Sequence, residues 1–243
     1  KTTAIDKGDH YLLNGTKNWI TNGNSASYYI VIAQTDIEKG HRGINAFIVD
    51  KEWEGFTVGA KENKLGIRGS DTHTLMFTDV KVPKENRIGE DGFGFKFAMK
   101  VLSGGRIGIA AQALGIASGA MELSIAYSKE RKAFGKEIHK HQAIAFKLAD
   151  MATEVEAARL LCLKAASLKD QGKNFDKESA MAKVFASRVA METTVEAVQV
   201  HGGYGFVKEY HVERLMRDAK ITQIYEGTTE VQKIVISRAI LNE

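Results

Sequence analysis

The hydrophobic period of this chain changes once, near residue 88, and that change limits the folds open to it. Before residue 88, short runs rich in β-branched and aromatic residues alternate with Gly, Asn, Asp and Lys, as in antiparallel strands. After it, apolar residues recur every three or four positions, as they do along one face of a helix. We therefore expect an α+β chain, with a β domain over residues 1–88 and a helical domain over residues 89–243.

Strand-like runs fill the first half of the chain. Strands are expected at residues 28–33, 44–49, 56–58 and 74–82, and their spacing favours a small antiparallel sandwich or barrel. Residues 11–13 and 17–21 are expected to form a hairpin, because the Asn14-Gly15 pair between them readily takes the positive φ angles of a tight turn. Pro83 is expected to close the last strand, where its missing N–H does least harm.

The second half of the chain predicts an antiparallel four-helix bundle. One apolar stripe, with steps of three or four residues, consists of Ile144, Leu148, Met151, Val155, Ala158 and Cys162. A helix expected from residue 106 to about 132 is rich in Gly and Ala, so we expect it to lie buried among its neighbours. Further helices are expected over residues 176–198, 212–218 and 229–241. Gly172 is expected to end the helix that carries the apolar stripe, and Asp176 to be the N-cap of the next helix. Thr228 or Thr229 is expected to cap the last helix.

Charge and composition exclude several classes of protein. The 34 basic and 30 acidic side chains give a net charge of +4 that is spread along the chain, so nucleic acid is not an expected partner. The same mild excess suits an anionic small molecule. Cys162 is the one cysteine, which rules out an internal disulfide. No apolar run approaches the roughly 18 residues of a membrane span, so none is expected.

Residues 199–206, Gln-Val-His-Gly-Gly-Tyr-Gly-Phe, directly follow a predicted helix. Two interpretations are open. The glycines end the helix, or a backbone without side chains lets a phosphate or nucleotide come close. The spacing does not match the Gly-x-Gly-x-x-Gly pattern of dinucleotide-binding folds, so a Rossmann site is not expected.

Two further segments carry side chains that are capable of chemistry. Glu226, next to Gly227 and just before the last predicted helix, is either a solvated surface carboxylate or a carboxylate that projects into a cleft. Trp19, in a strand-like run that ends at Thr21, is either a core residue or a side chain that packs against a flat heteroaromatic ring. The residues alone leave both alternatives open.

Basic and imidazole side chains follow the Gly/Ala-rich helix. Arg131 either compensates the negative C-terminal end of this helix or, together with Phe134, binds a phosphate and a base. His139 and His141 lie close together in the sequence. Without a third ligand they predict polar surface residues and no metal site.

The order of the motifs along the chain is more specific than any one of them. Its successive segments are Trp-Ile-Thr, Gly-Arg at the head of the Gly/Ala-rich helix, Glu-Arg-Lys-Ala-Phe-Gly-Lys, His-Gln-Ala-Ile, Gln-Val-His-Gly-Gly-Tyr-Gly, Met-Arg-Asp-Ala-Lys and Ile-Tyr-Glu-Gly-Thr-Thr-Glu-Val-Gln. With these segments in this order, the chain resembles the acyl-CoA dehydrogenase family, especially its short-chain and short/branched-chain members. The resemblance covers residues 1–243.

The resemblance implies an oxidoreductase of fatty-acid β-oxidation. Such a flavoprotein uses FAD to convert a short- or branched-chain acyl-CoA thioester to the trans-2-enoyl-CoA, and it passes the electrons to an electron-transfer flavoprotein. An acyl-CoA oxidase or other flavin oxidase on the same fold, and a non-enzymatic scaffold relative, are the alternatives. The implied location is the cytoplasm for a bacterial protein, or alternatively the mitochondrial matrix.

The implied architecture is a middle β domain followed by a four-helix bundle, assembled as a homotetramer that is a dimer of dimers. The family's N-terminal helical domain has no counterpart in residues 1–243. We therefore expect these residues by themselves to be inactive.

The resemblance also assigns roles to individual residues. Glu226 matches the catalytic base, and family branches that take the base from another segment do so at the position of Gly105, which has no side chain. The residues matched to FAD binding are Trp19, Ile20, Thr21, Arg131, Phe134, Gln142, Gln199, Val200, His201, Gly202, Gly203, Thr228 and Glu230. The residues matched to the acyl-CoA substrate are Ser103, Gly104, Gly105, Arg106 and Gly227. Ser103 departs from the Asp that many members carry at its position.

Overall fold

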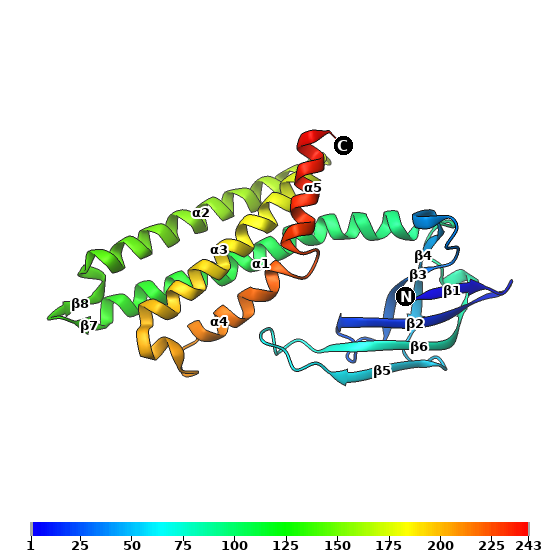
Figure 1. Cartoon of the computed structure of the whole chain (residues 1–243), viewed down its shortest axis with the longest axis horizontal. Coiled ribbons are helices and arrows are strands. Elements are labelled where there is room, and N and C mark those ends of the chain that lie inside the picture. The colour runs from blue at the N-terminus through cyan, green and yellow to red at the C-terminus, as the bar shows by residue number, and fades with distance from the viewer. Residues whose placement is uncertain (1, 243) are drawn as a thin grey trace. The chain divides into compact units, whose positions relative to one another are not determined.

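The structure, a computed structural model, describes residues 2–242 and divides them into two compact units (Figure 1). The β unit contains residues 2–64 and 68–101, and the helical unit contains residues 65–67 and 102–242. The predicted α+β fold class is therefore confirmed. The domain boundary expected between residues 88 and 89 stays a prediction.

A six-stranded sheet forms the β unit. Its strands are Thr3–Asp6 (β1), His10–Thr21 (β2), Tyr28–Gln34 (β3), Ile44–Asp50 (β4), Phe56–Lys61 (β5) and Thr72–Pro83 (β6). They lie in the order β4-β3-β1-β2-β6-β5, and neighbours are antiparallel except for β1 and β3. Alternating apolar side chains of these strands meet in one core that includes Leu13, Phe47 and Val80. As predicted, the last strand ends at Pro83.

The hairpin predicted at Asn14 and Gly15 is wrong. β2 runs through both residues as one strand, because it pairs with β1 on one side and with β6 on the other. Its register shifts between Leu13 and Gly15, and Gly15 has a φ of 133°, so the pair forms a bulge. Asn14 Nδ2 donates to Asp79 Oδ1 over 2.9 Å, and the Asp79 N–H donates to Asn14 Oδ1 over 2.9 Å. Pairing on two sides thus outweighs the local preference of Asn-Gly for a turn.

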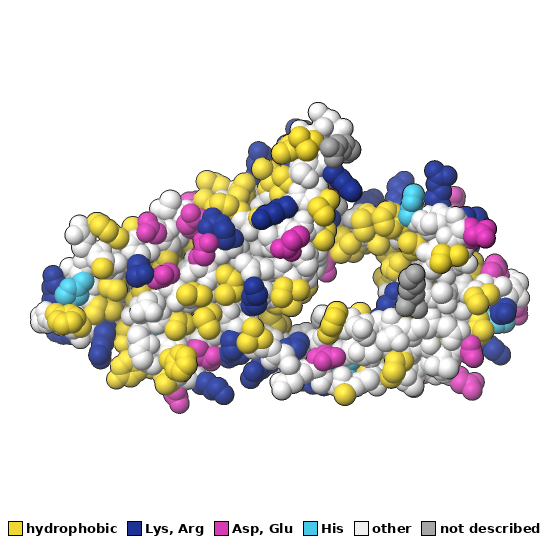
Figure 2. Space-filling view, in the orientation of Figure 1, with side chains coloured by type: hydrophobic (Ala, Val, Ile, Leu, Met, Phe, Trp, Pro, Cys, Tyr) yellow, Lys and Arg dark blue, Asp and Glu magenta, His cyan; other side chains and the backbone are white. Residues whose placement is uncertain are grey.

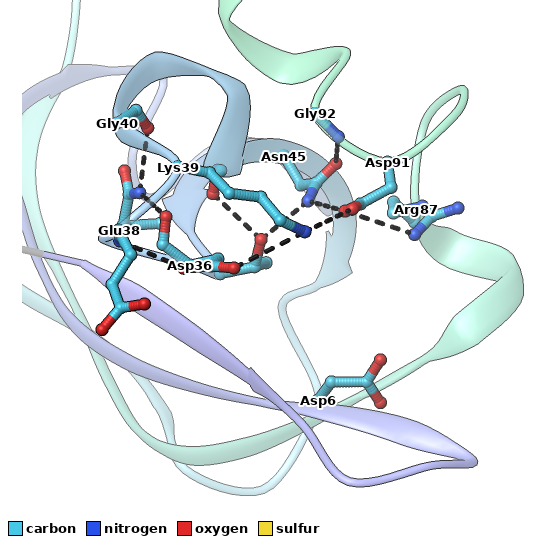
Figure 3. A network of polar contacts seen from close by, with 12 residues as sticks. Asp6, Asp36, Glu38, Lys39, Gly40, Asn45, Arg87, Asp91 and Gly92 are labelled. Carbon is cyan, nitrogen blue, oxygen red and sulfur yellow. Dashed lines mark hydrogen bonds and ion pairs between the residues drawn. The ribbon is translucent and has the colours of Figure 1, made fainter.

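A buried amide ties together two loops of the β unit (Figure 3). Asn45 Nδ2 donates to Thr35 Oγ1 over 2.9 Å and to Asp91 Oδ1 over 2.8 Å. Asn45 Oδ1 accepts the N–H of Gly92 over 2.9 Å. The ammonium group of the exposed Lys39 lies 3.7 Å from Asp91 Oδ2. We call this set of contacts the Asn45 network; it holds the end of β3 against the segment that follows β6.

The helical unit is a bundle of long helices joined by short links (Figure 1). The helices are Gly94–Glu130 (α1), Gln142–Asp170 (α2), Asp176–His201 (α3), Val212–Ala219 (α4) and Thr229–Leu241 (α5), and residues 94–101 of α1 belong to the β unit. Ala113 and Ala117 of α1, Val155 and Ala158 of α2 and Ala186 of α3 meet in one core. These small side chains let the helices approach closely. The predicted four-helix bundle is therefore present, with α4 as an additional short helix.

Helix α1 differs in two ways from the predicted helix. It begins at Gly94, well before residue 106, and continues through Gly104 and Gly105, which are poor helix formers. Its length and apolar composition would suffice for a membrane span, which corrects the prediction that no such run exists. Ala113 and Ala117 of this helix are fully buried in the core of the helical unit.

Candidate active site

Glu226 lies in a strained turn just before α5. Glu226 and Gly227 have φ angles of 53° and 90°. Thr228 then caps α5, because its Oγ1 accepts the N–H of Val231 over 3.4 Å. A positive φ is uncommon for a residue with a long side chain and persists only where the surroundings enforce it. Residues 225–228, here called the Glu226 turn, must therefore be held by neighbouring elements.

Two fully buried side chains hold the backbone of the Glu226 turn. Gln232 of α5 donates through Nε2 to the carbonyl oxygens of Glu226 and Gly227, over 3.1 and 3.0 Å. Lys183 of α3 donates through Nζ to the same Gly227 carbonyl. The turn is thus fastened to two helices of the bundle.

The Glu226 carboxylate packs on α1 at Gly105. A Cβ atom built on Gly105 would lie 2.7 Å from Glu226 Oε2, which is closer than real Cβ contacts allow. Gly105 therefore leaves the space that the carboxylate needs. The structure brings four predicted site residues together here, since Arg106 follows Gly105 and Gly227 follows Glu226. Ser103 and Gly104 lie beside them on α1.

Two buried cations lie near the Glu226 turn. Burial lowers the pKa of Lys183 to about 8; the carboxylates of Glu226 and Glu230 act to raise this pKa, and Arg106 acts to lower it. Burial also lowers the pKa of Arg106, and the carboxylates of Asp176 and Glu226 oppose that shift. The Glu226 carboxylate therefore shares its surroundings with positive charge from both α1 and α3.

Buried polar side chains from α1 and α5 surround the Glu226 turn. Tyr225 donates its hydroxyl to Gln112 of α1, and burial is the main cause that raises the pKa of Tyr225. Among residues 2–242, the buried side-chain nitrogens and oxygens without a hydrogen-bond partner are Arg106 Nε and Gln232 Oε1. Both residues belong to this site.

A hollow elsewhere in the helical unit gathers a second set of predicted residues. Its volume is about 800 Å³. Its lining consists of Tyr127, Arg131, Ala133, Phe134, Ile138, His141, Ile144, Val200, His201, Gly202, Gly203, Tyr204 and Val207. Phe134 lies between two short strands, Lys132–Ala133 (β7) and Lys136–Glu137 (β8), has a φ of 51° and is 95% exposed. The Arg131 guanidinium lies over the Tyr204 ring, 5.5 Å from its centroid. We call this site the aromatic hollow.

The end of α3 leaves open backbone at the aromatic hollow. Gly202 has a φ of 59°, and a Cβ built on Gly202 or Gly203 would have no atom within 4 Å. Next to them, the His201 ring stacks on Tyr127 with ring centroids 4.3 Å apart. Burial lowers the pKa of His201, which favours the uncharged ring. The hollow thus combines flat rings, one guanidinium and accessible main chain.

Trp19 lies at a second bulge of β2, in the β unit. The register with β6 shifts between Lys17 and Ile20, and Trp19 has a φ of 56°. Its side chain is 76% exposed, so the alternative of a core tryptophan is wrong. Ile20 and Thr21 line a hollow of about 450 Å³ within the β unit. Bulges redirect side chains and are frequent beside binding sites, which agrees with the exposure of Trp19.

Comparisons with known proteins match nearly the whole chain. Residues 1–80 match the family described as acyl-CoA dehydrogenase, middle domain. Residues 92–241 match the family described as acyl-CoA dehydrogenase, C-terminal domain. The chain belongs to the acyl-CoA dehydrogenase family.

Similar proteins are longer than this chain. It is 55% identical to the short-chain specific acyl-CoA dehydrogenase of Clostridium acetobutylicum, over 99% of this chain and 63% of the relative. It is 53% identical to the caffeyl-CoA reductase-Etf complex subunit CarC of Acetobacterium woodii, over 100% of this chain and 64% of the relative. The structure of butyryl-CoA dehydrogenase from Megasphaera elsdenii matches with a TM-score of 0.97 and 57% identity, over 99% of this chain and 63% of that one. The chain therefore spans less than two thirds of the length of these relatives.

Some predicted site residues lie outside both hollows. Gln142 begins α2 and Gln199 lies in the last turn of α3; both are exposed and neither lines the aromatic hollow. Thr228 and Glu230 lie at the start of α5. Hydrogen bonds from its own backbone N–H and from the Thr228 hydroxyl hold the pKa of Glu230 below its usual value. The cofactor-binding roles of these four residues stay predictions.

Lys183 and Gln232 were not among the predicted site residues. Lys183 falls at helical spacing on a buried stripe of α3 with Ala186 and Ala190. A lysine within a stripe of small, buried residues is the signal that could have identified it, because lysine is almost never fully buried without a partner. Gln232 carries no comparable signal, since glutamine is common on helices.

The two histidines that precede α2 bind the backbone. His139 Nδ1 hydrogen-bonds with the Ser128 carbonyl over 3.1 Å, and His141 Nε2 with the Ala133 carbonyl over 3.0 Å. Within the part of the chain that the structure describes, no group of three His, Cys, Asp or Glu side chains could hold a metal ion.

Proposed function

We propose that the complete protein catalyses the FAD-dependent α,β-dehydrogenation of a short- or branched-chain acyl-CoA thioester to the trans-2-enoyl-CoA, with Glu226 as the base. One observation carries this proposal: the Glu226 carboxylate lies on a strained, firmly held turn against the bare backbone of α1 at Gly105. Membership of the family supports the reaction class. Similarity to a short-chain specific acyl-CoA dehydrogenase and to butyryl-CoA dehydrogenase supports a short acyl chain.

Glu226 would remove the proton at the α carbon of the thioester. This carbon acid is weak, so the base must be fixed in contact with it. Gln232 holds the carbonyls of Glu226 and Gly227, and Lys183 holds the carbonyl of Gly227, which limits the orientations of the carboxylate. Gly105 has no side chain, so the Glu226 carboxylate can lie directly against the backbone of α1. The proton passes from the α carbon to a carboxylate oxygen of Glu226.

FAD, when bound, supplies the acceptor for the hydride that leaves the β carbon. The aromatic hollow fits the adenosine diphosphate part of this cofactor, because Arg131 offers a cation to a phosphate and Phe134 and Tyr204 offer flat faces. The space in front of Gly202 and Gly203 leaves main chain open to a ligand. In the β unit, residues 19–21 would contact the isoalloxazine ring, and the exposed Trp19 supports that role.

The protein would pass its electrons to an electron-transfer flavoprotein and assemble as a homotetramer, a dimer of dimers. Similarity to a subunit of an Etf complex supports the electron acceptor. Exposed apolar side chains of α2, namely Phe146, Leu160 and Leu163, support packing between copies. Figure 2 shows hydrophobic side chains interspersed among charged ones on the visible face of the helical unit. Sedimentation of the FAD-loaded protein as a monomer would contradict this assembly.

The Glu226→Gln variant of the complete, FAD-loaded protein tests the proposed base. Glutamine keeps the shape of glutamate but cannot accept the α proton. We expect the rate constant for flavin bleaching by butyryl-CoA to fall by roughly 1,000-fold or more, with FAD content and thioester affinity unchanged.

Glu192→Gln is the matched control, because it removes an exposed carboxylate of α3 that pairs with Arg188 on the surface. This variant should bleach at the wild-type rate. Near-wild-type bleaching by Glu226→Gln would show that the base lies elsewhere. Rapid oxygen consumption by the reduced wild-type protein would instead indicate an oxidase.

A further inference from the structure

Lys183 is a fully buried lysine, and its ammonium group donates a hydrogen bond to a backbone oxygen, the carbonyl of Gly227. Burying an ammonium group is unfavourable unless partners compensate for the lost water. A backbone carbonyl is a neutral partner, so it compensates less than a carboxylate would. A charged side chain at this position therefore needs a reason other than stability.

The Gly227 carbonyl does not depend on Lys183 for a hydrogen bond. Gln232 Nε2 donates to the same oxygen over 3.0 Å. An apolar side chain of similar length at position 183 would leave that oxygen paired and would remove a buried charge. Satisfying the turn's backbone thus does not explain the lysine.

The charged groups that face Lys183 come from three elements. The Glu226 carboxylate belongs to the turn, the Glu230 carboxylate to α5 and the Arg106 guanidinium to α1. Arg106 is also near Asp176, at the start of α3. The ammonium group therefore sits where it contacts the backbone next to Glu226 and acts on the Glu226 carboxylate through space.

We propose that Lys183 is a positioning residue for the base: its ammonium group fixes the Gly227 carbonyl and, together with its charge, holds the Glu226 carboxylate in its place against Gly105. This inference rests on the proposed function of Glu226. If Lys183 has this role, its substitution changes the rate of proton transfer without lowering the stability of the folded state, although these two quantities usually change together. Removing the lysine should slow proton transfer, while the folded state should lose no stability because a buried charge disappears with it.

Exchange of the methyl protons of acetyl-CoA in D₂O isolates the step that Lys183 is proposed to assist. Acetyl-CoA has α protons but no β carbon, so deprotonation cannot lead to dehydrogenation. The Glu226 carboxylate takes an α proton and leaves its electron pair on the thioester as an enolate. The carboxylate then exchanges its proton with D₂O and returns a deuteron to the same carbon. Proton NMR of the methyl signal gives the rate in the complete, FAD-loaded protein.

For Lys183→Met we expect the exchange rate at saturating acetyl-CoA to fall roughly 30-fold or more, because a base displaced by a fraction of an ångström loses much of its advantage. The dissociation constant of acetyl-CoA, from calorimetry, should stay within about twofold of the wild-type value. The melting temperature should be no lower than that of the wild type. Lys183→Gln keeps a hydrogen-bond donor without the charge, so its exchange rate should lie between those of the wild type and Lys183→Met. If Lys183→Met does not fold, the exchange rate and melting temperature of Lys183→Gln are compared with those of the wild type instead.

Val189→Ala is the stability control, because it opens a cavity in the buried core of the same helix without altering the turn. It should lower the melting temperature and leave the exchange rate near the wild-type value. Exchange by Lys183→Met at the wild-type rate would overturn the proposal. A loss of rate that Val189→Ala reproduces at the same loss of stability would overturn it as well, since the role would then be structural.

Glu226→Gln measured in parallel separates this inference from the function on which it rests. If Glu226→Gln exchanges the methyl protons as fast as the wild type, the proposed base is wrong and so is the role of Lys183. If Glu226→Gln is inactive in exchange but Lys183→Met is not, the base stands and the positioning role of Lys183 is wrong.

Discussion

The Asn45 network of the β unit and the Glu226 turn of the helical unit both fasten a loop through fully buried polar side chains, but in opposite ways. In the Asn45 network, the buried group is a neutral amide, and both its nitrogen and its oxygen have partners (Figure 3). Its charged members, Lys39 and Asp91, are exposed. At the Glu226 turn, the buried groups include Lys183 and Arg106, and Arg106 Nε has no hydrogen-bond partner among residues 2–242.

This difference separates structural from functional use of polar side chains. The Asn45 hydrogen bond holds the pKa of Asp91 below its usual value, so this contact stabilises the folded state of the β unit at neutral pH. The Glu226 turn combines a strained backbone with buried charge, both of which lower stability. Substitutions in the two regions should therefore affect different measurements.

Among the substitutions that test this contrast, Gly105→Ala in the helical unit is expected to have the largest effect. The added Cβ would lie 2.7 Å from Glu226 Oε2 and would push the carboxylate away. We expect flavin bleaching by butyryl-CoA to slow by roughly 100-fold, because a misplacement of about 1 Å can have that effect.

Gly108→Ala is the matched control for that substitution. Gly108 lies on the same helix, and a Cβ there would have no atom within 4 Å. Its substitution should leave bleaching unchanged and stabilise α1 slightly, since alanine is the better helix former. Equal rates for the two alanine variants would show that the Glu226 carboxylate does not need the space at Gly105.

A stability loss without a specific loss of rate is expected for Asn45→Ala in the β unit. The substitution removes three hydrogen bonds and leaves the half-buried Gly92 N–H without this partner. We expect the free energy of unfolding to fall by about 2–3 kcal/mol. Urea unfolding of the complete protein, followed by circular dichroism, measures this change.

Asn86→Ala provides the comparison within the β unit, because Asn86 makes a more exposed hydrogen bond to the Ile48 carbonyl over 3.0 Å. Asn86→Ala should lower the free energy of unfolding by less than about 1 kcal/mol. If Asn45→Ala left stability unchanged but slowed bleaching, the Asn45 network would have a functional role and the contrast with the Glu226 turn would fail.

The smallest effect concerns the pH dependence of stability. Burial lowers the pKa of Lys183 from 10.5 to about 8 in the folded state. Between these values the unfolded chain binds a proton that the folded chain has released, so stability increases as pH rises. The gain should be about 1 kcal/mol between pH 8 and 9. Urea unfolding at each pH should show this gain reduced in Lys183→Met relative to the wild type.

Lys17 of the β unit is a half-buried lysine with which Lys183 can be compared. It donates to the Ile32 carbonyl over 2.6 Å, and burial alone lowers its pKa, which gives a pH dependence of the same sign. Lys17→Met should therefore also flatten the rise of stability with pH. In contrast to Lys183→Met, it should leave acetyl-CoA exchange at the wild-type rate. An equal effect of both variants on exchange would contradict a specific role for Lys183.

Much of the fold could be predicted from local sequence. α5 spans Thr229–Leu241 as predicted, because Thr228 provides its N-cap and an apolar pattern follows. The hairpin at Asn14 and Gly15 failed because its outcome depended on two neighbouring strands. The site was predictable only where the family motifs named its residues, as for Glu226 and Gly105.

The sequence by itself determined the spacing of apolar residues in the two units, the caps and ends of several helices, and the presence of a carboxylate beside a glycine. Those features depend on residues within a few positions of each other. Only the tertiary structure decided that Glu226 rests on Gly105, that Lys183 and Gln232 share the Gly227 carbonyl and that Trp19 is exposed. Each of these depends on which side chains folding brings together from distant segments. Local pattern does not encode that, because burial and partner choice are set by packing between helices and pairing between strands.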